Sequence, residues 1–207
     1  MRGFFYFVIM WIGESDMDIS ALFYTTRLGK SLKNSLHKFD KDVLMADISQ
    51  ARDFYDEALE TMDFPYDYRI KSRESCRIKY DRYYPNYAVE RTYNDLFGAR
   101  IIVEDYRQAY EMTSIQPSRE SDLTLGKRTD DGYRGLHLYY QPDHFVYPIE
   151  FQFNTASDRR LNDWLHSYLY KKGYAPEIGG RLRALYDAGH IHTEEDFRRE
   201  FNVLLGC

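Results

Sequence analysis

A chain of 207 residues with 43% hydrophobic and 29% charged residues has the composition of a globular domain, and it is long enough to bury a core without disulfides. Its net charge of -5 argues against a surface that coats nucleic acid broadly, but it is compatible with a local basic patch. The only cysteines, Cys76 and Cys207, cannot build a disulfide framework, so we expect a reducing, cytoplasmic location.

The N-terminal segment is apolar over residues 4–12. The run is reminiscent of the core of a signal peptide, but residues 13–16 offer no small-residue cleavage site for one. It is also far too short to span a bilayer. We therefore expect residues 1–17 to dock on the body of the protein, to be disordered, or to lie upstream of a true start at Met10 or Met17. No membrane association is expected.

Two helices are predicted in the first third of the chain, over residues 18–39 and 43–62. In the later helix, apolar side chains recur at helical spacing at Leu44, Ile48, Ala51, Tyr55, Leu59 and Met62. The earlier helix is basic along one side, where it carries Arg27, Lys30, Lys33 and Lys38. Such a face suits phosphate contacts with a nucleic acid, and an ordinary solvated face is the alternative.

The run from Arg69 to Lys79 is the most informative stretch of the sequence. If it is helical from Ser72, Lys71, Ser75 and Lys79 lie on one face, each a turn beyond the last. That face presents an ammonium group, a hydroxyl and a second ammonium group in a line, with the guanidinium of Arg69 at its foot. Lysine neutralises phosphate as a point charge, and arginine forks onto phosphate or stacks on a base, so the line suits a polyphosphate. A solvated, charged helix face is the alternative.

Beyond this run the pattern changes. A strand is predicted over residues 99–104, and Asp105 can cap a helix that reaches about Met112. Residues 114–132 are polar and predict a mobile loop.

Adjacent strands are predicted next, over residues 136–141 and 146–153. Asp158 is expected to cap a helix, and further short helices follow, the last starting at Thr193 with Asp196 at the capping-box spacing. No repeat, low-complexity segment or linker divides the chain. The sequence therefore predicts a single α/β (α+β) domain over residues 1–207, built on a mixed sheet.

Two carboxylates stand where a metal ion could be held. Asp95 lies at the mouth of a predicted strand, and Gly98 lets the backbone approach closely; a turn Asp beside a surface Arg100 is the alternative. In the later strand, Glu150 and Gln152 point away from the large apolar side chains that alternate with them. A carboxylate central in so apolar a strand is costly unless it is paired or binds a cation. We therefore predict that Asp95 and Glu150 share one Mg²⁺ ion.

Between these carboxylates lies the segment Gly132-Tyr133-Arg134-Gly135-Leu136-His137. Its glycines permit a tight turn that could project Tyr133 from the sheet edge as a stacking platform. A core aromatic is the alternative. No Ser/His/Asp arrangement, zinc-type cluster or Walker-type loop competes with this assembly.

The order of the motifs resembles the synthetase domain of the RelA/SpoT family, especially its small single-domain members. R-x-K-S-x-x-S-x3-K is followed by D-x-x-G-x-R, G-Y-R-G-x-H and E-x-Q, and the resemblance covers residues 68–172. It implies a nucleotidyltransferase-like fold, with a mixed sheet of about five strands flanked by helices. The implied reaction transfers the β,γ-diphosphate of ATP to a ribose 3′-hydroxyl, with Mg²⁺ as cofactor.

The resemblance also implies a role for each matching position. Asp95 and Glu150 would be the catalytic, metal-binding pair, and Glu150 would also take the proton from the attacking hydroxyl. ATP would be held by Arg69, Lys71, Ser75, Lys79, Arg82 and Arg100, with Arg69 and Arg100 sandwiching the adenine. The acceptor side would be lined by Tyr133, His137 and Gln152.

The acceptor motifs are where this sequence departs from the housekeeping alarmone synthetases. Asp130 and Asp131 precede the Gly-Tyr pair, where those enzymes usually have a basic residue or Pro-x-Asn. Asn154 replaces an arginine of their E-I-Q-x-R-T motif. Residues 158–172 look more like the toxic small synthetases of toxin–antitoxin and phage-defence loci, several of which modify tRNA.

We therefore predict the 3′-terminal adenosine of tRNA as the leading acceptor, which would block aminoacylation and translation and would imply a protein antitoxin as partner. Contacts with tRNA phosphates are predicted for Arg27, Lys30, Lys33, Arg119, Lys127 and Arg128. The runner-up acceptor is a guanosine nucleotide, GDP or GTP, and hence alarmone synthesis. A catalytically silent nucleotide- or partner-binding module is the remote alternative, and no DNA partner is expected.

Overall fold

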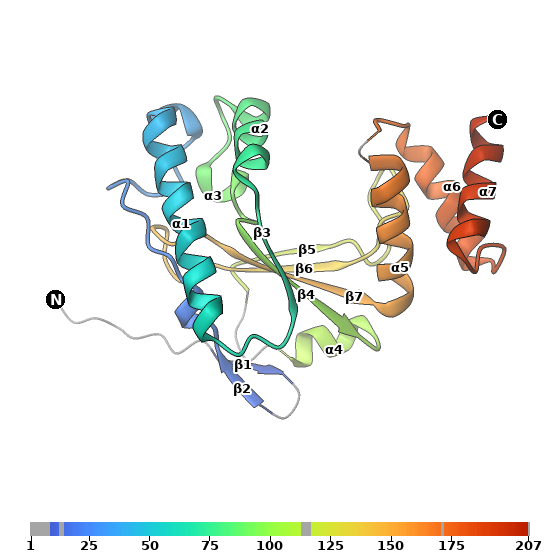
Figure 1. Cartoon of the computed structure of the whole chain (residues 1–207), viewed down its shortest axis with the longest axis horizontal. Coiled ribbons are helices and arrows are strands. Elements are labelled where there is room, and N and C mark those ends of the chain that lie inside the picture. The colour runs from blue at the N-terminus through green and yellow to red at the C-terminus, as the bar shows by residue number, and fades with distance from the viewer. Residues whose placement is uncertain (1–8, 13–14, 113–116, 171, 207) are drawn as a thin grey trace. The chain divides into compact units, whose positions relative to one another are not determined.

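The structure is a computed structural model that describes residues 9–12, 15–112, 117–170 and 172–206 (Figure 1). The chain divides into two compact units, which are described separately below. The first unit comprises residues 1–101, 110–120 and 138–152, and the second comprises residues 102–109, 121–137 and 153–207. The prediction of a single domain over the whole chain stays a prediction.

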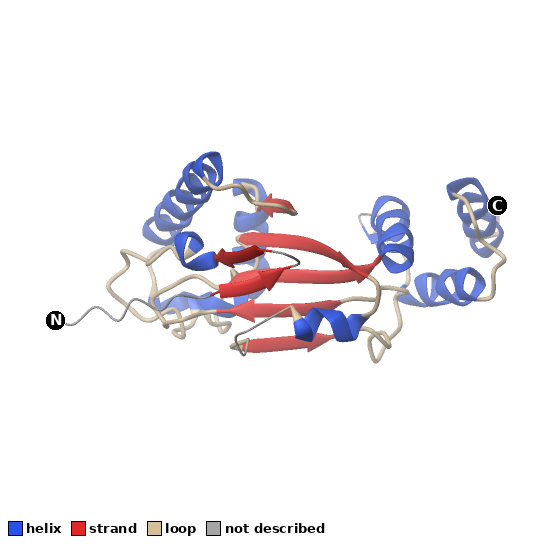
Figure 2. Cartoon of the chain, turned by 90° about the horizontal axis from the view of Figure 1, so that it is seen from below, coloured by secondary structure: helices blue, strands red, loops and turns tan. Residues whose placement is uncertain are grey.

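The structure contains a five-stranded sheet, which confirms the sheet of about five strands that the resemblance implies, and its strand order is β3-β4-β7-β6-β5. Its strands are β3 (Asp67–Ile70), β4 (Phe97–Val103), β5 (Arg119–Asp122), β6 (Leu136–Tyr140) and β7 (Ile149–Thr155). β3 pairs antiparallel with β4, with Arg69 opposite Gly98. The neighbouring strands β4 and β7 run in the same direction in Figure 1, whereas β3 is antiparallel to β4, so the sheet is mixed; Figure 2 shows it from below. A separate antiparallel ribbon joins β1 (Ile9–Ile12) to β2 (Ser15–Asp18).

Helix α1 (Lys41–Thr61) confirms the predicted second helix. Asp40 caps it by accepting hydrogen bonds from the backbone N–H groups of Asp42 and Val43. Its predicted apolar stripe is buried at Leu44, Ile48, Ala51 and Tyr55. The helix therefore forms because a strong cap and an apolar face coincide in one segment.

The predicted helix over residues 18–39 is wrong. Only the short 3₁₀ turns Ile19–Leu22 and Leu36–Lys38 form there. Between them the backbone bonds to a distant loop, because the N–H of Thr26 donates to the carbonyl of Phe145 at 2.7 Å and that of Leu32 to the carbonyl of His144 at 2.8 Å. Gly29 takes a left-handed φ of 65°, which interrupts any helix. The segment is still part of the core, because Leu22, Leu32 and Leu36 are fully buried.

The other helices of the first unit begin near the polyphosphate-like run. α2 (Arg73–Tyr83) starts where the sequence predicts, with Ser72 as its N-cap accepting from the N–H of Ser75. The single turn α3 (Val89–Thr92) follows it.

One further local prediction is confirmed and two need correction. α4 (Tyr106–Glu111) follows Asp105, whose carboxylate accepts from the backbone of its first turn, as predicted. The predicted loop over residues 114–132 contains β5, and its residues 113–116 lie outside the described part of the chain. α5 (Ala156–Leu165) is capped by Thr155 and not by Asp158, because Asp158 sits in the first turn and its N–H donates to the Thr155 hydroxyl.

The second unit has its own helical core. α5 continues into a π-helical turn, His166–Tyr170, and is followed by α6 (Pro176–Asp187) and α7 (Glu194–Leu205). The predicted capping box of Thr193 and Asp196 begins α7. The core of these helices consists of Leu161, Leu165, Leu169, Leu182, Ile191, Phe197 and Phe201.

Asp47 on α1 is a buried hydrogen-bonding centre of the first unit, with 4% of its surface exposed. Its carboxylate accepts from the Thr26 hydroxyl at 2.7 Å, from the N–H of Arg27 at 2.8 Å and from the Tyr147 hydroxyl at 2.9 Å. Burial raises the pKa of Tyr147, and the neighbouring carboxylate raises it further, so this hydroxyl stays a donor. Asp47 thus joins the irregular segment before α1 to the approach to β7.

We expect Asp47→Ala to lower the free energy of unfolding by roughly 2–4 kcal/mol, because it leaves buried donors without an acceptor. Urea denaturation measures this, with Asp56→Ala at an exposed site on the same helix as the control. Equal effects of the two changes would contradict the role of Asp47.

Candidate functional site

The described structure brings most of the predicted donor-side residues together in the first unit. One pocket is lined by Arg69, Lys71, Asp95, Gly98, Arg100, Glu150 and Gln152. Apart from Gly98, each of these is a predicted site residue, and they come from β3, the segment before α2, the approach to β4, β4 itself and β7. Residues spread over more than eighty positions of the sequence therefore form one local assembly.

Asp95 holds two of the predicted phosphate-binding lysines. The ammonium of Lys71 contacts its Oδ2, and that of Lys79 lies 2.8 Å from its Oδ1. Lys79 also donates to the carbonyl of Thr92 at 3.2 Å. Burial raises the pKa of Asp95, but the charges of Lys79 and Lys71 and their hydrogen bonds outweigh it, so the pKa lies below its ordinary value. The carboxylate is therefore ionised and keeps both cations at the pocket.

The other members of the α2 line are more exposed. The Ser75 hydroxyl accepts from that of Ser72 at 2.9 Å, in the first turn of the helix. Arg82 lies exposed in the last turn of α2 and does not line the pocket. A role for Arg82 with phosphate stays a prediction.

Glu150 lies in the middle of the sheet with 6% of its surface exposed. Its Oε1 accepts from the Tyr139 hydroxyl at 2.8 Å, and its Oε2 accepts from Nε2 of Gln152 at 2.7 Å. On the β4 side, a Cβ added to Gly98 would lie only 3.3 Å from Oε2. The glycine of the D-x-x-G-x-R motif thus gives the carboxylate its room.

The two predicted adenine-binding arginines lie on neighbouring strands. Arg69 on β3 is paired with Gly98, and Arg100 is two residues further along β4. Paired residues, and residues two apart on a strand, project to the same face of a sheet, so both arginine side chains lie on one face. Both line the pocket with Glu150. Their placement is compatible with gripping one planar group between them.

Tyr133 and His137 lie in the second unit, whereas Gln152, predicted with them, lies beside Glu150 in the first. The Tyr133 hydroxyl is 2.8 Å from Nε2 of His137, and the Lys127 ammonium is 5.5 Å from the Tyr133 ring centre. The turn before Tyr133 needs a glycine, because Gly132 has a φ of 85° and an added Cβ would lie 2.4 Å from the carbonyl of Gly179. Tyr133 is half-buried and held in place by its own loop.

The departures from the housekeeping pattern have partners inside this loop. Asp130 forms a two-pronged ion pair with the Arg134 guanidinium, with both contacts at 2.8 Å, and Asp131 lies 2.5 Å from the Lys127 ammonium. Asn154 donates to the carbonyl of Arg134 at 2.9 Å. These side chains fix the turn that presents Tyr133.

The predicted tRNA-binding residues differ in their exposure and in their contacts with the rest of the protein. Arg27, Lys33 and Arg128 are exposed. Lys30 donates to the carbonyl of Lys38 at 2.8 Å, and Arg119 packs with its guanidinium carbon 3.8 Å from the Tyr139 ring centre.

Tyr139 is the residue of this site that the motifs miss. A signal for it exists, since it follows His137 by two residues on the same strand and therefore points to the same face.

The carboxylates fit a magnesium ion. Within the described residues, no group of three or more His, Cys, Asp or Glu side chains could hold a metal ion. Mg²⁺ does not need such a group, because it is usually bound by one or two carboxylates together with substrate phosphates. Asp95 and Glu150 line the same pocket and are therefore the residues that would hold it.

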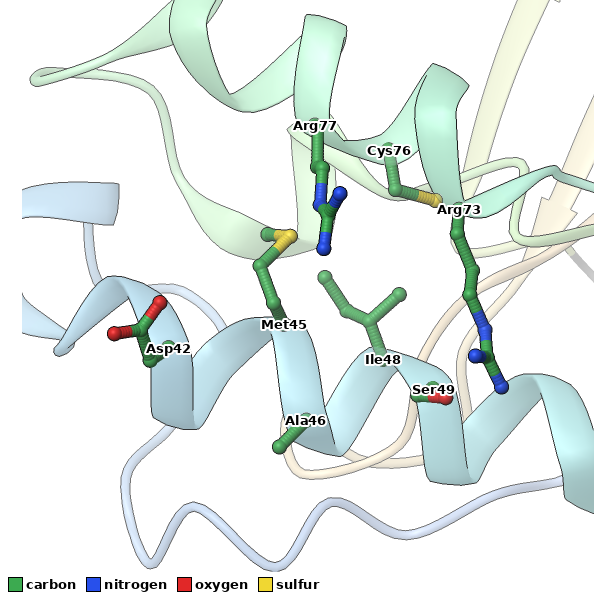
Figure 3. A pocket seen from close by; sticks show the side chains of 8 residues that line it. All are labelled: Asp42, Met45, Ala46, Ile48, Ser49, Arg73, Cys76 and Arg77. Atoms are coloured by element: carbon green, nitrogen blue, oxygen red, sulfur yellow. The ribbon is translucent and has the colours of Figure 1, made fainter.

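A second hollow of about 280 Å³ lies between α1 and α2 (Figure 3). Arg73 and Arg77 enter it from α2, and Met45, Ile48 and Ser49 enter it from α1. None of its lining residues belongs to the predicted site.

Comparison with known proteins finds no matching family model and no matching curated protein. Among solved structures, small alarmone synthetase 1 from Bacillus subtilis, bound to its product pppGpp, is 22% identical; the match covers 80% of this chain and 90% of that one, with a TM-score of 0.46. A GTP pyrophosphokinase family protein from Streptococcus pneumoniae is 21% identical, with coverages of 78% and 91% and a TM-score of 0.47. Small alarmone synthetase 2 from Bacillus subtilis is 17% identical, with coverages of 82% and 100% and a TM-score of 0.49. Similarities at this level assign no activity to this chain.

Across the described residues, no helix combines the length and the apolar character needed to cross a bilayer.

The lowered pKa of Asp95 predicts how stability depends on pH. Because the pKa in the folded state lies below the ordinary value of 3.8, the contribution of Asp95 is complete above that value and is lost as the pH falls through the folded pKa. We expect Asp95→Asn to reduce the free energy of unfolding at pH 7, and the gap from wild type to narrow below about pH 4.

Urea denaturation in EDTA at several pH values measures this gap. Asp81→Asn removes an exposed partner of Lys41 and serves as the control, with a small effect at every pH. If Asp95→Asn differs from wild type by the same free energy of unfolding at pH 7 and pH 3.5, the ionised Asp95 carboxylate does not stabilise the fold and the prediction is wrong.

Proposed function

We propose that this protein is an ATP-dependent diphosphotransferase that moves the β,γ-diphosphate of ATP to a ribose 3′-hydroxyl. The observation that supports it most is the single pocket in which Asp95, Glu150 and Lys71 meet Arg69 and Arg100. A polyphosphate needs clustered cations, a metal site needs carboxylates, and an attacking hydroxyl needs a base. The pocket contains all of these groups.

The reaction needs positioning and charge neutralisation more than covalent help. The 3′-hydroxyl oxygen attacks the β-phosphorus, the bond between that phosphorus and the oxygen bridging to the α-phosphate breaks, and AMP leaves. Glu150 accepts the hydroxyl proton, while Lys71 and Lys79 turn from Asp95 to the phosphate oxygens. Mg²⁺ held by Asp95 and Glu150 would neutralise phosphate charge during the transfer.

Two acceptors carry the required 3′-hydroxyl. The tRNA end is supported by the resemblance of residues 158–172 to toxic synthetases and by exposed Arg27, Lys33 and Arg128. A guanosine nucleotide is supported at least as well, because two of the proposed tRNA contacts already have partners within the protein: Arg119 packs on Tyr139, and Lys127 pairs with Asp131. A protein antitoxin as partner belongs with the tRNA alternative.

Labelled ATP distinguishes these acceptors. We incubate the protein and Mg²⁺ with ATP labelled at the γ-phosphate and with tRNA, GDP or GTP, and follow the label. Label only in a guanosine nucleotide would sink the tRNA alternative, and label only at the tRNA 3′ end would sink alarmone synthesis. We expect Glu150→Gln to reduce transfer by about 100- to 10,000-fold with an unchanged melting temperature.

No transfer by the wild type to any of these acceptors would contradict the proposed activity. Toxicity or partner binding that persists in Glu150→Gln would then favour a catalytically silent module.

The contacts of Asp95 make a further prediction about binding. Without metal, the triphosphate competes with the Asp95 carboxylate for Lys71 and Lys79. We therefore expect Asp95→Asn to bind a non-hydrolysable ATP analogue more tightly than wild type in EDTA, by about tenfold or ~1.4 kcal/mol. Added Mg²⁺ should strengthen binding to wild type and have little effect on the variant.

Isothermal titration calorimetry with and without Mg²⁺ measures both effects. Asp81→Asn, which frees Lys41 and changes no residue of the pocket, should match wild type throughout. Weaker binding by Asp95→Asn in EDTA would show that the two lysines do not compete in this way.

A further inference from the structure

We propose that Tyr139 and Arg119 are positioning residues for Glu150. Neither residue is among the predicted catalytic or ATP-binding positions. Tyr139 fixes the carboxylate by a direct hydrogen bond, and Arg119 supports Tyr139 from the next strand. The chemical consequence rests on the proposed function, whereas the contacts themselves do not.

The three residues form a row across neighbouring strands. β5, β6 and β7 are consecutive in the sheet, and each contributes one member. The guanidinium carbon of Arg119 lies 3.8 Å from the centre of the Tyr139 ring, and the Tyr139 hydroxyl lies 2.8 Å from Oε1 of Glu150. All three side chains belong to the first unit.

Tyr139 is suited to hold the carboxylate permanently. Its side chain is 7% exposed. The hydroxyl is the donor in its contact with Oε1 of Glu150, because an ionised carboxylate can only accept. Gln152 donates to Oε2 at 2.7 Å, so Tyr139 and Gln152 each hold one of the two carboxylate oxygens.

Arg119 supports this donor electrostatically. A cation over the face of a phenol ring is attracted to its π electrons and draws electron density from the hydroxyl, which makes the hydroxyl a stronger donor.

The surroundings of Arg119 show that it is turned inward. Its Nη2 and Oε2 of Glu90 are buried, and neither has a hydrogen-bond partner among the described residues. Both residues line a small pocket of about 50 Å³ together with Tyr139. A tRNA phosphate would have to draw the guanidinium off the ring, so the positioning role and the tRNA role predict different kinetics.

The first test separates these roles. Tyr139→Phe keeps the ring under Arg119 and removes only the hydroxyl, so we expect kcat to fall by about 10- to 100-fold while KM for ATP stays within about twofold. Tyr140→Phe makes the same change on the opposite face of β6, where the ring packs on Phe151, and should leave kcat near wild type. A rise in KM for ATP with unchanged kcat would overturn the role of Tyr139.

For Arg119, we expect Arg119→Met to lower kcat by the same factor with every acceptor that is used, and Arg119→Lys to restore part of it. Arg91→Met removes an exposed cation from the same pocket and is the matched control. A selective rise in KM for tRNA would place Arg119 on the acceptor and overturn its positioning role.

A second test does not depend on activity. We compare the effect of Tyr139→Phe on the urea midpoint in wild type with its effect in the Glu150→Ala background. The hydrogen bond predicts a loss of stability in wild type, and no loss in the Glu150→Ala background because the hydroxyl there has no carboxylate to bind. Equal losses would refute the contact. If the wild type transfers no diphosphate, the proposed function fails, and this cycle still decides whether Tyr139 holds Glu150.

Discussion

A carboxylate buried in the centre of the sheet, Glu150, is the constraint on which the candidate site depends. An ionised group in that position is costly unless hydrogen bonds or a cation compensate for the lost water. The strands on either side supply what it needs. β6 contributes the hydroxyl of Tyr139, and β4 contributes Gly98, whose missing side chain leaves the space that Oε2 approaches. Gln152, two residues further along β7, donates a hydrogen bond to Oε2.

The same balance of charge explains how an acidic protein can build a site for polyphosphate. The chain has a net charge of -5. At the pocket, however, Arg69, Arg100, Lys71 and Lys79 outnumber the carboxylates of Asp95 and Glu150. Field lines concentrate where like charges cluster over a low-dielectric wall, so the local potential there is positive against the overall charge. Asp95 keeps two of these cations from repelling each other until another anion arrives.

Local signals in the sequence predicted the parts of the fold that local interactions decide. The cap and the apolar stripe of α1, the Ser72 cap of α2 and the capping box of α7 are each complete within a few residues, so a single segment specifies them. The segment 18–39 has helical spacing too, yet its backbone bonds to the loop at 144–145, and no local pattern contains that partner. β5 was missed for a related reason, because it is a short edge strand whose residues are polar on both faces.

The residues of the candidate site show the same difference between local signals and long-range contacts. Asp95, Glu150 and the lysines of α2 were found because the chemistry of phosphate restricts the residue types and their spacing. Arg119 was assigned to tRNA because its charge is visible in the sequence, whereas its contact with Tyr139 depends on β5 lying beside β6.

The acidic departures before Tyr133 carry a similar lesson. Asp130 binds Arg134, and Asp131 binds Lys127. Asn154 donates to the same turn. Each of these residues has a structural use inside the loop, so their divergence from the housekeeping pattern accounts for how Tyr133 is held and is weak support for a nucleic-acid acceptor.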